Sequence, residues 1–345
     1  MLLSDPAAFP RDKLCGGGLT KKSLDVLCEL EPRFLSSGIP EFVHEFVLIH
    51  PTNHETSTVR IEANDVALVH RIEFDAWLRG RAQDAGATLS NSPGSAEWTI
   101  VADGVSSPEG KPIRGPFKNH EIAIATESFV PGNGESRISL MLHPTHDPSD
   151  LGYSWVFSRA DSVGLGTGVI RSHDSKLVEY RGVMERAAWG IYKIRPATYR
   201  NWTIPLFGKR PATNGSTALV GDALGTADPV FLEGIASGLI SGKVLVDHFS
   251  ATGQFAGYEA ALWSHPFFLG MEYLSKLQKA ASLDFENTFD MFADTDSLRR
   301  VVACILGNTP PQELLMWLAL RYPLSAISLY LRKKILFRNP RAGGG

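Results

Sequence analysis

The sequence predicts a mixed α/β fold, and three stretches of the chain carry that prediction. Residues 218–249 read as a short buried strand, a loop rich in glycine and proline, and a helix that begins near Gly234. Residues 113–205 hold several short runs that read as antiparallel strands. Residues 266–345 are mostly helical in pattern. The expected fold therefore combines a strand–helix part, an antiparallel β part and a helical C-terminal region.

The composition is that of an ordinary globular protein. Of the 345 residues, 43% are hydrophobic and 21% are charged, which provides enough apolar material for a sizeable core. With 34 basic and 37 acidic residues the formal charge is −3, so nucleic acid is not expected as a main partner. The three cysteines show no metal-ligand spacing, and their sparse use favours a reducing, cytoplasmic compartment. The sequence shows no secretory signal and no apolar run long enough to span a membrane.

The helix that begins near Gly234 has small residues at Ala236, Gly238 and Gly242. Without bulky side chains there, a flat ligand or another backbone segment can lie close to the start of the helix. A helix N-terminus also offers unpaired N–H groups to an electron-rich ligand. The alternative is an ordinary strand–loop–helix unit that happens to be rich in small residues.

The loop before this helix reads Gly-Asp-Ala, then Pro, then Glu-Gly-Ile. This pattern resembles the second flavin motif of the para-hydroxybenzoate hydroxylase superfamily, and most closely that of its geranylgeranyl reductase branch. The resemblance implies that Asp222 holds the ribityl chain of FAD and that the helix start faces the flavin pyrimidine. The residues that it assigns to the cofactor in this stretch are Gly221, Asp222, Pro229, Gly234, Ile235 and Ala236.

The N-terminal segment carries a second match to the same branch. A short strand ends at Asp5, and the chain then reads Phe-Pro-Arg-Asp-Lys-Leu-Cys-Gly-Gly before a helix over about residues 21–29. In the family, an acid at this strand end binds the adenosine ribose and the Cys-Gly-Gly loop passes beside the flavin ring. The resemblance therefore implies cofactor contacts for Asp5, Cys15, Gly16 and Gly17, with Cys15 as the candidate catalytic residue. The alternative is a solvated loop whose cysteine has no functional role.

Two further segments resemble the family. Residues 71–87 predict a helix with a glycine near its C-terminal end, and their Arg-x-x-Phe-Asp-x-x-Leu pattern is similar to a family signature. This places Arg71 near the phosphates or ribityl chain of FAD, although Arg71 and Asp75 could instead form a surface ion pair one helical turn apart. The Asp103-Gly104 turn follows a predicted strand and resembles the family's Ala-Asp-Gly motif beside the cofactor diphosphate.

An aromatic run, Gly-Tyr-Ser-Trp-Val-Phe, resembles the reductase pattern Gly-Tyr-x-Trp-x-Phe-Pro, with Ser158 in place of the usual proline. Because side chains alternate along a strand, Tyr153, Trp155 and Phe157 should share one face. The resemblance implies that this face lines a pocket for a long apolar substrate such as an isoprenoid. A stripe that simply packs the core is the alternative.

The resemblance also implies a domain organisation. A Rossmann-like FAD-binding domain is expected at residues 1–35, 70–112 and 213–265, a substrate-binding β domain at 36–69 and 113–212, and a helical region at 266–345. A dinucleotide fold normally opens with a strand, a Gly-x-Gly-x-x-Gly turn and a helix, and the printed sequence starts about where the next strand belongs. The FAD-binding domain is therefore expected to be N-terminally truncated. Either the natural protein lacks this unit or the sequence lacks roughly its first thirty residues.

The implied function is FAD-dependent reduction of prenyl-chain double bonds in an isoprenoid lipid, by hydride transfer from reduced flavin. NADPH or another reductant would be the electron donor. Two alternatives stay open, namely a flavin monooxygenase of the same fold and a non-catalytic remnant that no longer binds FAD. A flavin-dependent halogenase ranks low because Arg200 stands where the first of two tryptophans is expected.

The C-terminal region is basic. From Glu313 to Gly345 there are six lysines or arginines and one acidic residue. An apolar stretch with a basic end predicts either contact with an anionic membrane surface or an ordinary packing helix.

Overall fold

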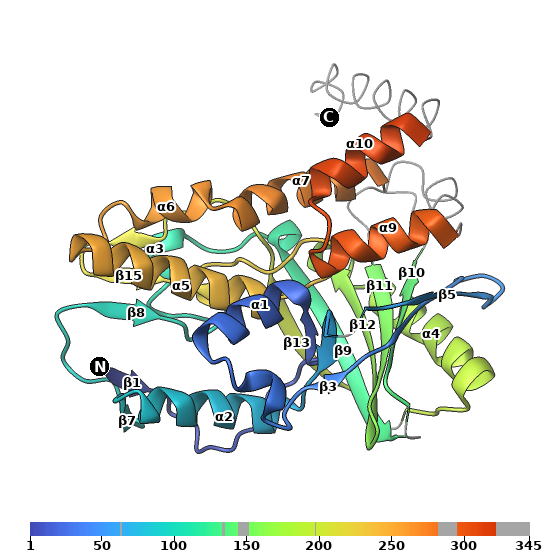
Figure 1. Ribbon diagram of the computed structural model, residues 1–345, viewed down its shortest axis with the longest axis horizontal. Coiled ribbons are helices and arrows are strands. Elements are labelled where there is room, and N and C mark those ends of the chain that lie inside the picture. Colours follow the sequence, from blue (N-terminus) through green and yellow to red (C-terminus); the bar gives the residue numbers. More distant parts are fainter. Residues whose placement is uncertain (63, 133–134, 144–151, 197, 282–294, 322–345) are drawn as a thin grey trace.

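The structure is a computed structural model, and it describes residues 1–345 except 63, 133–134, 144–151, 197, 282–294 and 322–345. Two halves lie side by side (Figure 1). One half is built on a seven-stranded sheet, whereas the other holds helices and three small sheets. The predicted mixed α/β fold is therefore confirmed.

The large sheet has the strand order β13-β9-β12-β11-β10-β4-β5. Its strands are β4 (Glu45–Ile49), β5 (Thr56–Arg60), β9 (Ile122–Pro131), β10 (Arg137–Leu142), β11 (Gly152–Ser158), β12 (Ser162–Ile170) and β13 (Arg200–Pro205). Neighbouring strands are antiparallel except for β10 and β4, which are parallel. The antiparallel part that the sequence predicts is present, and two strands from the N-terminal third of the chain extend it.

The two faces of this sheet pack against different layers. Val47 and Ile49 belong to a core cluster beneath α4 (Lys176–Tyr192), whereas Phe46 and Leu48 point to the opposite face. We call that opposite side the inner face. Helix α9 (Thr295–Leu306) covers part of the inner face.

A histidine is buried beneath α4. The His143 ring stacks on Tyr180 with ring centroids 4.2 Å apart, and its Nε2 lies 2.6 Å from Ser154 Oγ. Burial lowers the pKa of His143 to about 3, because a low-dielectric environment disfavours the charged imidazolium. The ring is therefore neutral in the native protein at ordinary pH.

Acid is expected to destabilise the protein through His143. In the unfolded chain this side chain takes up a proton at its ordinary pKa of 6.5, whereas in the native state it stays neutral down to about 3. The free energy of unfolding should therefore fall as the pH drops, by about 3 kcal/mol between about pH 7 and about pH 4. Denaturant titrations at stepped pH should show this slope flattened in His143→Gln and unchanged in His44→Gln, which alters an exposed histidine. An identical slope in wild type and His143→Gln would contradict the assignment.

The other half contains three small sheets. One has the order β14-β15-β8, one has the order β2-β6-β3, and β1 pairs with β7 in parallel. Their bounds are β1 (Leu2–Ser4), β2 (Gly18–Thr20), β3 (Glu41–Phe42), β6 (Val66–Leu68), β7 (Thr88–Ser90), β8 (Thr99–Val101), β14 (Thr213–Asn214) and β15 (Thr217–Leu219). Strand β6 pairs with both β2 and β3, so β3 and β6 belong to this small sheet and not to the large one.

The helices of this half confirm the predicted starts. Helix α1 begins at Lys21, α2 at Arg71, and α5 at Ile235 directly after Gly234. The remaining bounds are α1 (Lys21–Leu30), α2 (Arg71–Asp84), α3 (Lys111–Arg114), α5 (Ile235–Thr252), α6 (Tyr258–Ser264), α7 (Pro266–Ala281) and α10 (Pro311–Arg321), with short 3-10 helices η1 (Phe34–Ser36), η2 (Asn119–Glu121), η3 (Arg171–His173) and η4 (Gly221–Ala223).

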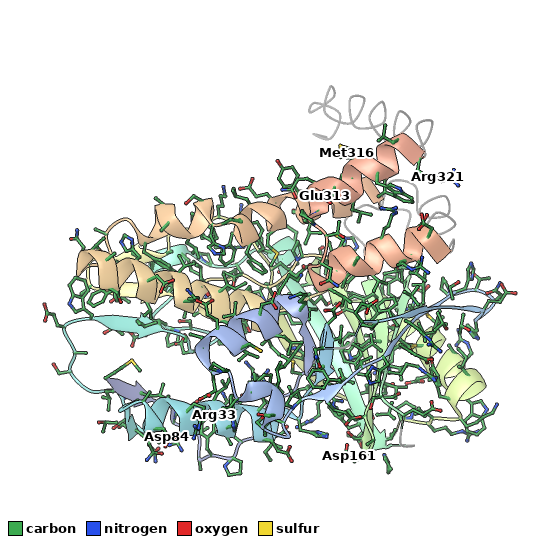
Figure 2. The ribbon with its side chains drawn as sticks, in the orientation of Figure 1. Arg33, Asp84, Asp161, Glu313, Met316 and Arg321 are labelled. Atoms are coloured by element: carbon green, nitrogen blue, oxygen red, sulfur yellow. The ribbon has the colours of Figure 1, made fainter. Side chains whose placement is uncertain are left out.

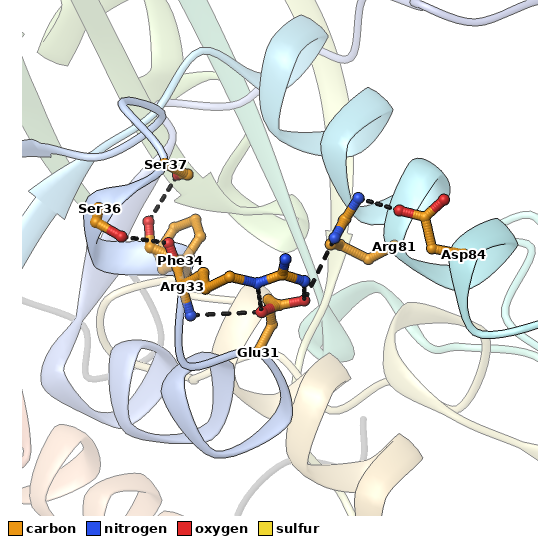
Figure 3. Close-up of polar contacts among 7 residues, drawn as sticks. All are labelled: Glu31, Arg33, Phe34, Ser36, Ser37, Arg81 and Asp84. Atoms are coloured by element: carbon orange, nitrogen blue, oxygen red, sulfur yellow. Dashed lines mark hydrogen bonds and ion pairs between the residues drawn. The ribbon is translucent and has the colours of Figure 1, made fainter.

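Helices α1 and α2 are linked at their C-terminal ends. Glu31 accepts a hydrogen bond from Arg33 Nε at 2.9 Å and lies 3.7 Å from Arg81 Nη1 (Figure 3). The Arg33 pair lowers the pKa of Glu31 to about 2. Because Arg33 is exposed and water screens the pair, the link orients the helix ends and contributes little stability.

The structure confirms part of the predicted helical region at residues 266–345. The predicted helix from Glu313 to Arg321 is α10, and Figure 2 places Met316 and Arg321 at the outer edge of the molecule. The basic stretch that follows lies outside the described residues. Within the described part of the chain, no helix combines the length and the apolar character needed to cross a bilayer.

Candidate active site

The Cys-Gly-Gly loop lies on the inner face of the large sheet. A Cβ atom placed on Gly16 would come within 2.8 Å of the Phe157 ring and 3.3 Å of Trp155 Nε1. Gly17 has φ +70°, and a Cβ there would lie 2.1 Å from the Val69 carbonyl oxygen, so this position requires glycine. The loop is therefore pressed against the aromatic strand β11.

A buried arginine fastens this loop to the sheet. Arg159 follows β11, and its Nη2 donates to the carbonyl oxygens of Gly16 and, at 3.2 Å, of Val69. Its Nε and Nη1 have no hydrogen-bond partner among the described residues. Burial lowers the pKa of Arg159 and outweighs the opposing effects of Glu127 and Cys15.

The start of α5 adjoins the same loop. The hydroxyls of Thr20 and Ser23 both donate to Glu233 Oε1 at 2.9 Å, one residue before Gly234. Ile235 and Leu239 of α5 pack against the cluster beneath α1, which includes Leu19. The structure therefore brings together the two segments that the sequence expects on either side of a flavin.

Asp222 lies at the start of α5. A Cβ on Gly234 would lie 3.2 Å from Asp222 Oδ1, and a Cβ on Gly221 would lie 3.4 Å from the Cα of Gly238. These glycines allow the turn at η4 to touch the helix. Desolvation raises the pKa of Asp222, whereas the nearby Lys13 and Arg71 lower it. Among the residues that the structure describes, none donates a hydrogen bond to this carboxylate, which leaves it free to accept hydroxyl groups.

Arg71 belongs to a network of alternating charges. Its Nε donates to Asp75 Oδ1 at 2.8 Å, Arg11 lies 3.4 Å from Asp75, and Arg11 lies 3.5 Å from Asp5. The ion pair between Arg71 and Asp75 is the alternative that the sequence left open, but it is buried, with side chains 12% and 9% exposed. Although burial lowers the pKa of Arg71, interactions with Cys15 and Asp75 raise it overall. The network joins Asp5 to Cys15.

The Asp103-Gly104 turn joins the site through Arg114. The Nε of Arg114 donates to the Ala223 carbonyl at 2.6 Å, and its Nη2 donates to the Val105 carbonyl at 3.1 Å. Asp103 itself is exposed, and Gly104 has φ +90°, as expected for a tight turn. Arg114 therefore holds this turn against η4, next to Asp222. Pro229 is buried in the loop that leads to α5.

The three aromatic side chains share the inner face, as predicted. Ring centroids of Tyr153 and Trp155 are 5.3 Å apart, and those of Trp155 and Phe157 are 6.3 Å apart. Tyr153 and Trp155 are members of the buried core, whereas Phe157 is partly exposed. Tyr153 and Trp155 therefore pack within the core and Phe157 contacts the loop at Gly16, and a substrate pocket on this face stays a prediction.

Comparison of the sequence with known proteins finds reductases. The chain is 25% identical to a geranylgeranyl diphosphate reductase of Synechocystis, over 95% of this chain and 85% of the relative. It is 24% identical to a menaquinone reductase of Mycobacterium tuberculosis, over 86% of this chain and 80% of the relative. No family model matches the chain. The chain is therefore similar over most of its length to reductases with these two names.

Solved structures of flavoproteins share the fold. A geranylgeranyl bacteriochlorophyll reductase-like protein from Thermoplasma acidophilum superimposes with a TM-score of 0.71 and 18% identity, covering 96% of this chain and 91% of that chain. A flavin-dependent brominase superimposes with a TM-score of 0.68 and 15% identity, covering 95% and 92%. The chain therefore has the fold of FAD-dependent oxidoreductases, as the sequence predicts.

The charged and polar groups of this region fit a flavin. Arg71 acts electrostatically on both Cys15 and Asp222, so the Cys-Gly-Gly loop and the turn at η4 lie in the same region. The partly exposed Asp222 carboxylate has no partner in the described chain, and two cations lie within its electrostatic reach. An anionic, flat ligand with hydroxyl groups suits this set of groups.

Sequence reasoning missed a second carboxylate at this site. Glu127 lies on β9, is 1% exposed, and accepts a hydrogen bond from Trp155 Nε1 at 2.9 Å. Burial raises its pKa to about 7, although the bond from Trp155 and the charges of Arg159 and Arg200 lower it. The available signal was a charged residue between the apolar residues of a strand segment, Ile-Ala-Thr-Glu-Ser-Phe.

A row of glycines lets Trp155 reach Glu127. Gly164, Gly166 and Gly168 lie on β12, between β9 and β11, and Gly166 pairs with both Glu127 and Trp155. A Cβ on Gly166 would lie 2.0 Å from the indole, so the ring occupies the space that a side chain would take. These glycines therefore belong to the large sheet and form a trough for the indole.

Proposed function

We propose that this protein is an FAD-dependent reductase of carbon–carbon double bonds in the prenyl chain of an isoprenoid lipid. The observation that carries the proposal is the meeting of the Cys15-Gly16-Gly17 loop, the free Asp222 carboxylate and an aromatic sheet face in one region. Two relatives support the proposal by their names, since one is a geranylgeranyl diphosphate reductase and the other a menaquinone reductase, and both names denote reduction of a molecule with a prenyl chain.

Several residues would bind and orient the cofactor. The Asp222 carboxylate would accept hydroxyl groups of the ribityl chain, and the first N–H groups of α5 would face the electron-rich end of the ring. Arg71 and Lys13 supply positive charge beside Asp222. When bound, FAD supplies the hydride-transfer chemistry. NADPH is our proposed reductant for the flavin.

Other residues would prepare the substrate. An isolated alkene has no carbonyl group to polarise, so the protein must hold the double bond in place and provide a proton. Phe157 and the neighbouring aromatic side chains offer an apolar face that excludes water from the reacting carbons. The exposed apolar side chains Met316 and Leu320 of α10 suit a substrate that is delivered from a lipid surface.

The proposal predicts a turnover that needs no oxygen. Protein reconstituted with FAD is reduced with dithionite without oxygen, and is then mixed with geranylgeranyl diphosphate or menaquinone. The flavin absorbance near 450 nm should return, and mass spectrometry should detect a product with one double bond saturated. Asp222→Ala should weaken FAD binding by about 10- to 100-fold, the loss expected for a hydrogen bond to a charged acceptor.

A matched control separates this effect from a general loss of charge. Asp247→Asn removes an exposed carboxylate that pairs with Lys243 on the same helix, and it should leave FAD binding unchanged. Protein that takes up no FAD would support the non-catalytic remnant. Protein that oxidises substrate only with oxygen would support a flavin monooxygenase.

A further inference from the structure

Glu127 combines deep burial with an unused oxygen. Its Oε1 accepts the Trp155 indole N–H at 2.9 Å, but its Oε2 has no hydrogen-bond partner in the described chain. Buried polar atoms without a partner are rare in folded proteins because each costs desolvation free energy. An unpaired carboxyl oxygen in a packed core therefore points to a role beyond stability.

The carboxyl group lies in the same region as the Cys-Gly-Gly loop. Trp155 Nε1, which binds Glu127, would lie only 3.3 Å from a Cβ on Gly16. Glu127 and Cys15 both act electrostatically on Tyr153 and on Arg159, so all four side chains share one region. Glu127 thus lies beside the Cys-Gly-Gly loop although it is on the far side of β12 from Trp155.

Tyr153 and Cys15 also carry acidic protons in this region, but they are less suited to donate one. The Tyr153 hydroxyl donates to the Phe231 carbonyl at 2.5 Å, and burial raises its pKa further above the ordinary value. The Cys15 sulfur accepts the Gly17 N–H at 3.4 Å and also interacts with the Arg71 guanidinium, so it is placed as an acceptor. Glu127 is the group whose free oxygen is not engaged.

We propose that Glu127 is the general acid of the reduction. One alkene carbon receives hydride from the reduced flavin, and the other takes the proton of the Glu127 carboxylic acid as the π bond is consumed. Glu127 is left as a carboxylate, which solvent protonates before the next turnover. This inference rests on the proposed function, since the alkene substrate belongs to it.

The surroundings of Glu127 raise its pKa, so that a large share of the group is still protonated near neutral pH. An ordinary glutamic acid, with a pKa of 4.5, is ionised at pH 7, whereas burial raises the pKa of Glu127 to about 7. The charged groups that face it are Arg159, after β11, and Arg200 on β13, and both lower the pKa less than burial raises it. A pKa near the working pH is the value at which a general acid is most effective.

Glu127→Gln tests the proposal, because glutamine keeps the shape and cannot supply the proton. In the anaerobic single-turnover assay, this variant should reduce the alkene about 10²- to 10⁴-fold more slowly while its FAD affinity stays at the wild-type value. The rate in wild-type protein should also fall as the pH rises above about 7, since the carboxylic acid is then lost. The matched control, Glu45→Gln, removes a carboxylate of the same sheet that pairs with Arg137, and it should reduce the alkene normally.

A second readout needs neither cofactor nor turnover. The indole N–H of Trp155 reports on Glu127 directly, and its NMR signal is assigned with Trp155→Phe. In wild-type protein this signal should shift with a midpoint near pH 7, and in Glu127→Gln it should not titrate. This readout tests whether Glu127 titrates near neutral pH even if a Glu127 variant fails to fold, because it is measured on the wild-type protein.

The outcomes separate the two proposals. A Glu127→Gln protein that reduces the alkene at the wild-type rate, or an indole signal of wild type that does not titrate around neutrality, overturns the role of Glu127 and leaves the proposed function intact. A wild-type protein that binds FAD but reduces no prenyl chain overturns the proposed function and, with it, this role.

Discussion

Replacing Gly166 by alanine is expected to lower the free energy of unfolding by about 1–3 kcal/mol, the usual cost of overpacking a core. The added Cβ would lie 2.0 Å from Trp155 Cζ2 and 2.1 Å from Cε2. Neither group can easily move, because β12 is hydrogen-bonded on both sides and the indole packs edge-on against Trp202 with centroids 6.2 Å apart. The ring must therefore leave the trough and lose its bond to Glu127.

Denaturant titration measures the stability, and the indole N–H signal of Trp155 reports on the displaced ring. Gly80→Ala is the control, since a Cβ at this position in α2 meets nothing within 4 Å. It should stabilise the protein by up to about 1 kcal/mol, because alanine favours helix more than glycine does. A Gly166→Ala protein as stable as wild type, with an unshifted indole signal, would show that the sheet adapts and that the trough is not needed.

The parts of the fold that the sequence could predict depend on local pattern. The alternation in β11 placed Tyr153 and Trp155 on one face because side chains in any strand alternate. The start of α5 at Ile235 followed from the glycine before it and the apolar run after it. The order of the family motifs also brought the N-terminal segment to the start of α5, where Thr20 and Ser23 bond to Glu233, which neither pattern could do by itself.

The parts that could not be predicted depend on contacts between distant residues. Glu127 and Trp155 lie on strands that are separated by β12, so the sequence gives no sign of their contact. Most of β9 is buried on both faces, so the alternation of its residues does not single out Glu127. Arg159 is charged and follows a strand, a position that predicts exposure, yet it is buried because the loop at Gly16 closes over it. The pair of Arg71 and Asp75 has the spacing of a surface ion pair, yet it is buried, and Arg11 from the N-terminal segment lies beside Asp75.

Arg114→Met is expected to lower the free energy of unfolding by about 3 kcal/mol. The guanidinium donates to three backbone carbonyls, those of Val105, Gly115 and Ala223, and it lies 3.7 Å from the centroid of the Phe117 ring. Hydrogen bonds from a charged donor are stronger than neutral ones, and methionine of similar length would leave buried carbonyl oxygens unpaired. Arg114 is also the described link between the turn at Asp103 and η4, so its loss should loosen both.

Arg33→Met provides the matched comparison. Arg33 is also an arginine with several hydrogen bonds, but its side chain is 73% exposed and its partner is Glu31 (Figure 3). Water replaces those bonds, so this variant should unfold at nearly the wild-type denaturant concentration. If FAD binds between the two segments that Arg114 joins, Arg114→Met should weaken its binding under conditions where the protein is still folded, whereas Arg33→Met should not. Equal stability and equal FAD affinity in the two variants would contradict the idea that a buried arginine holds the cofactor side of the site together.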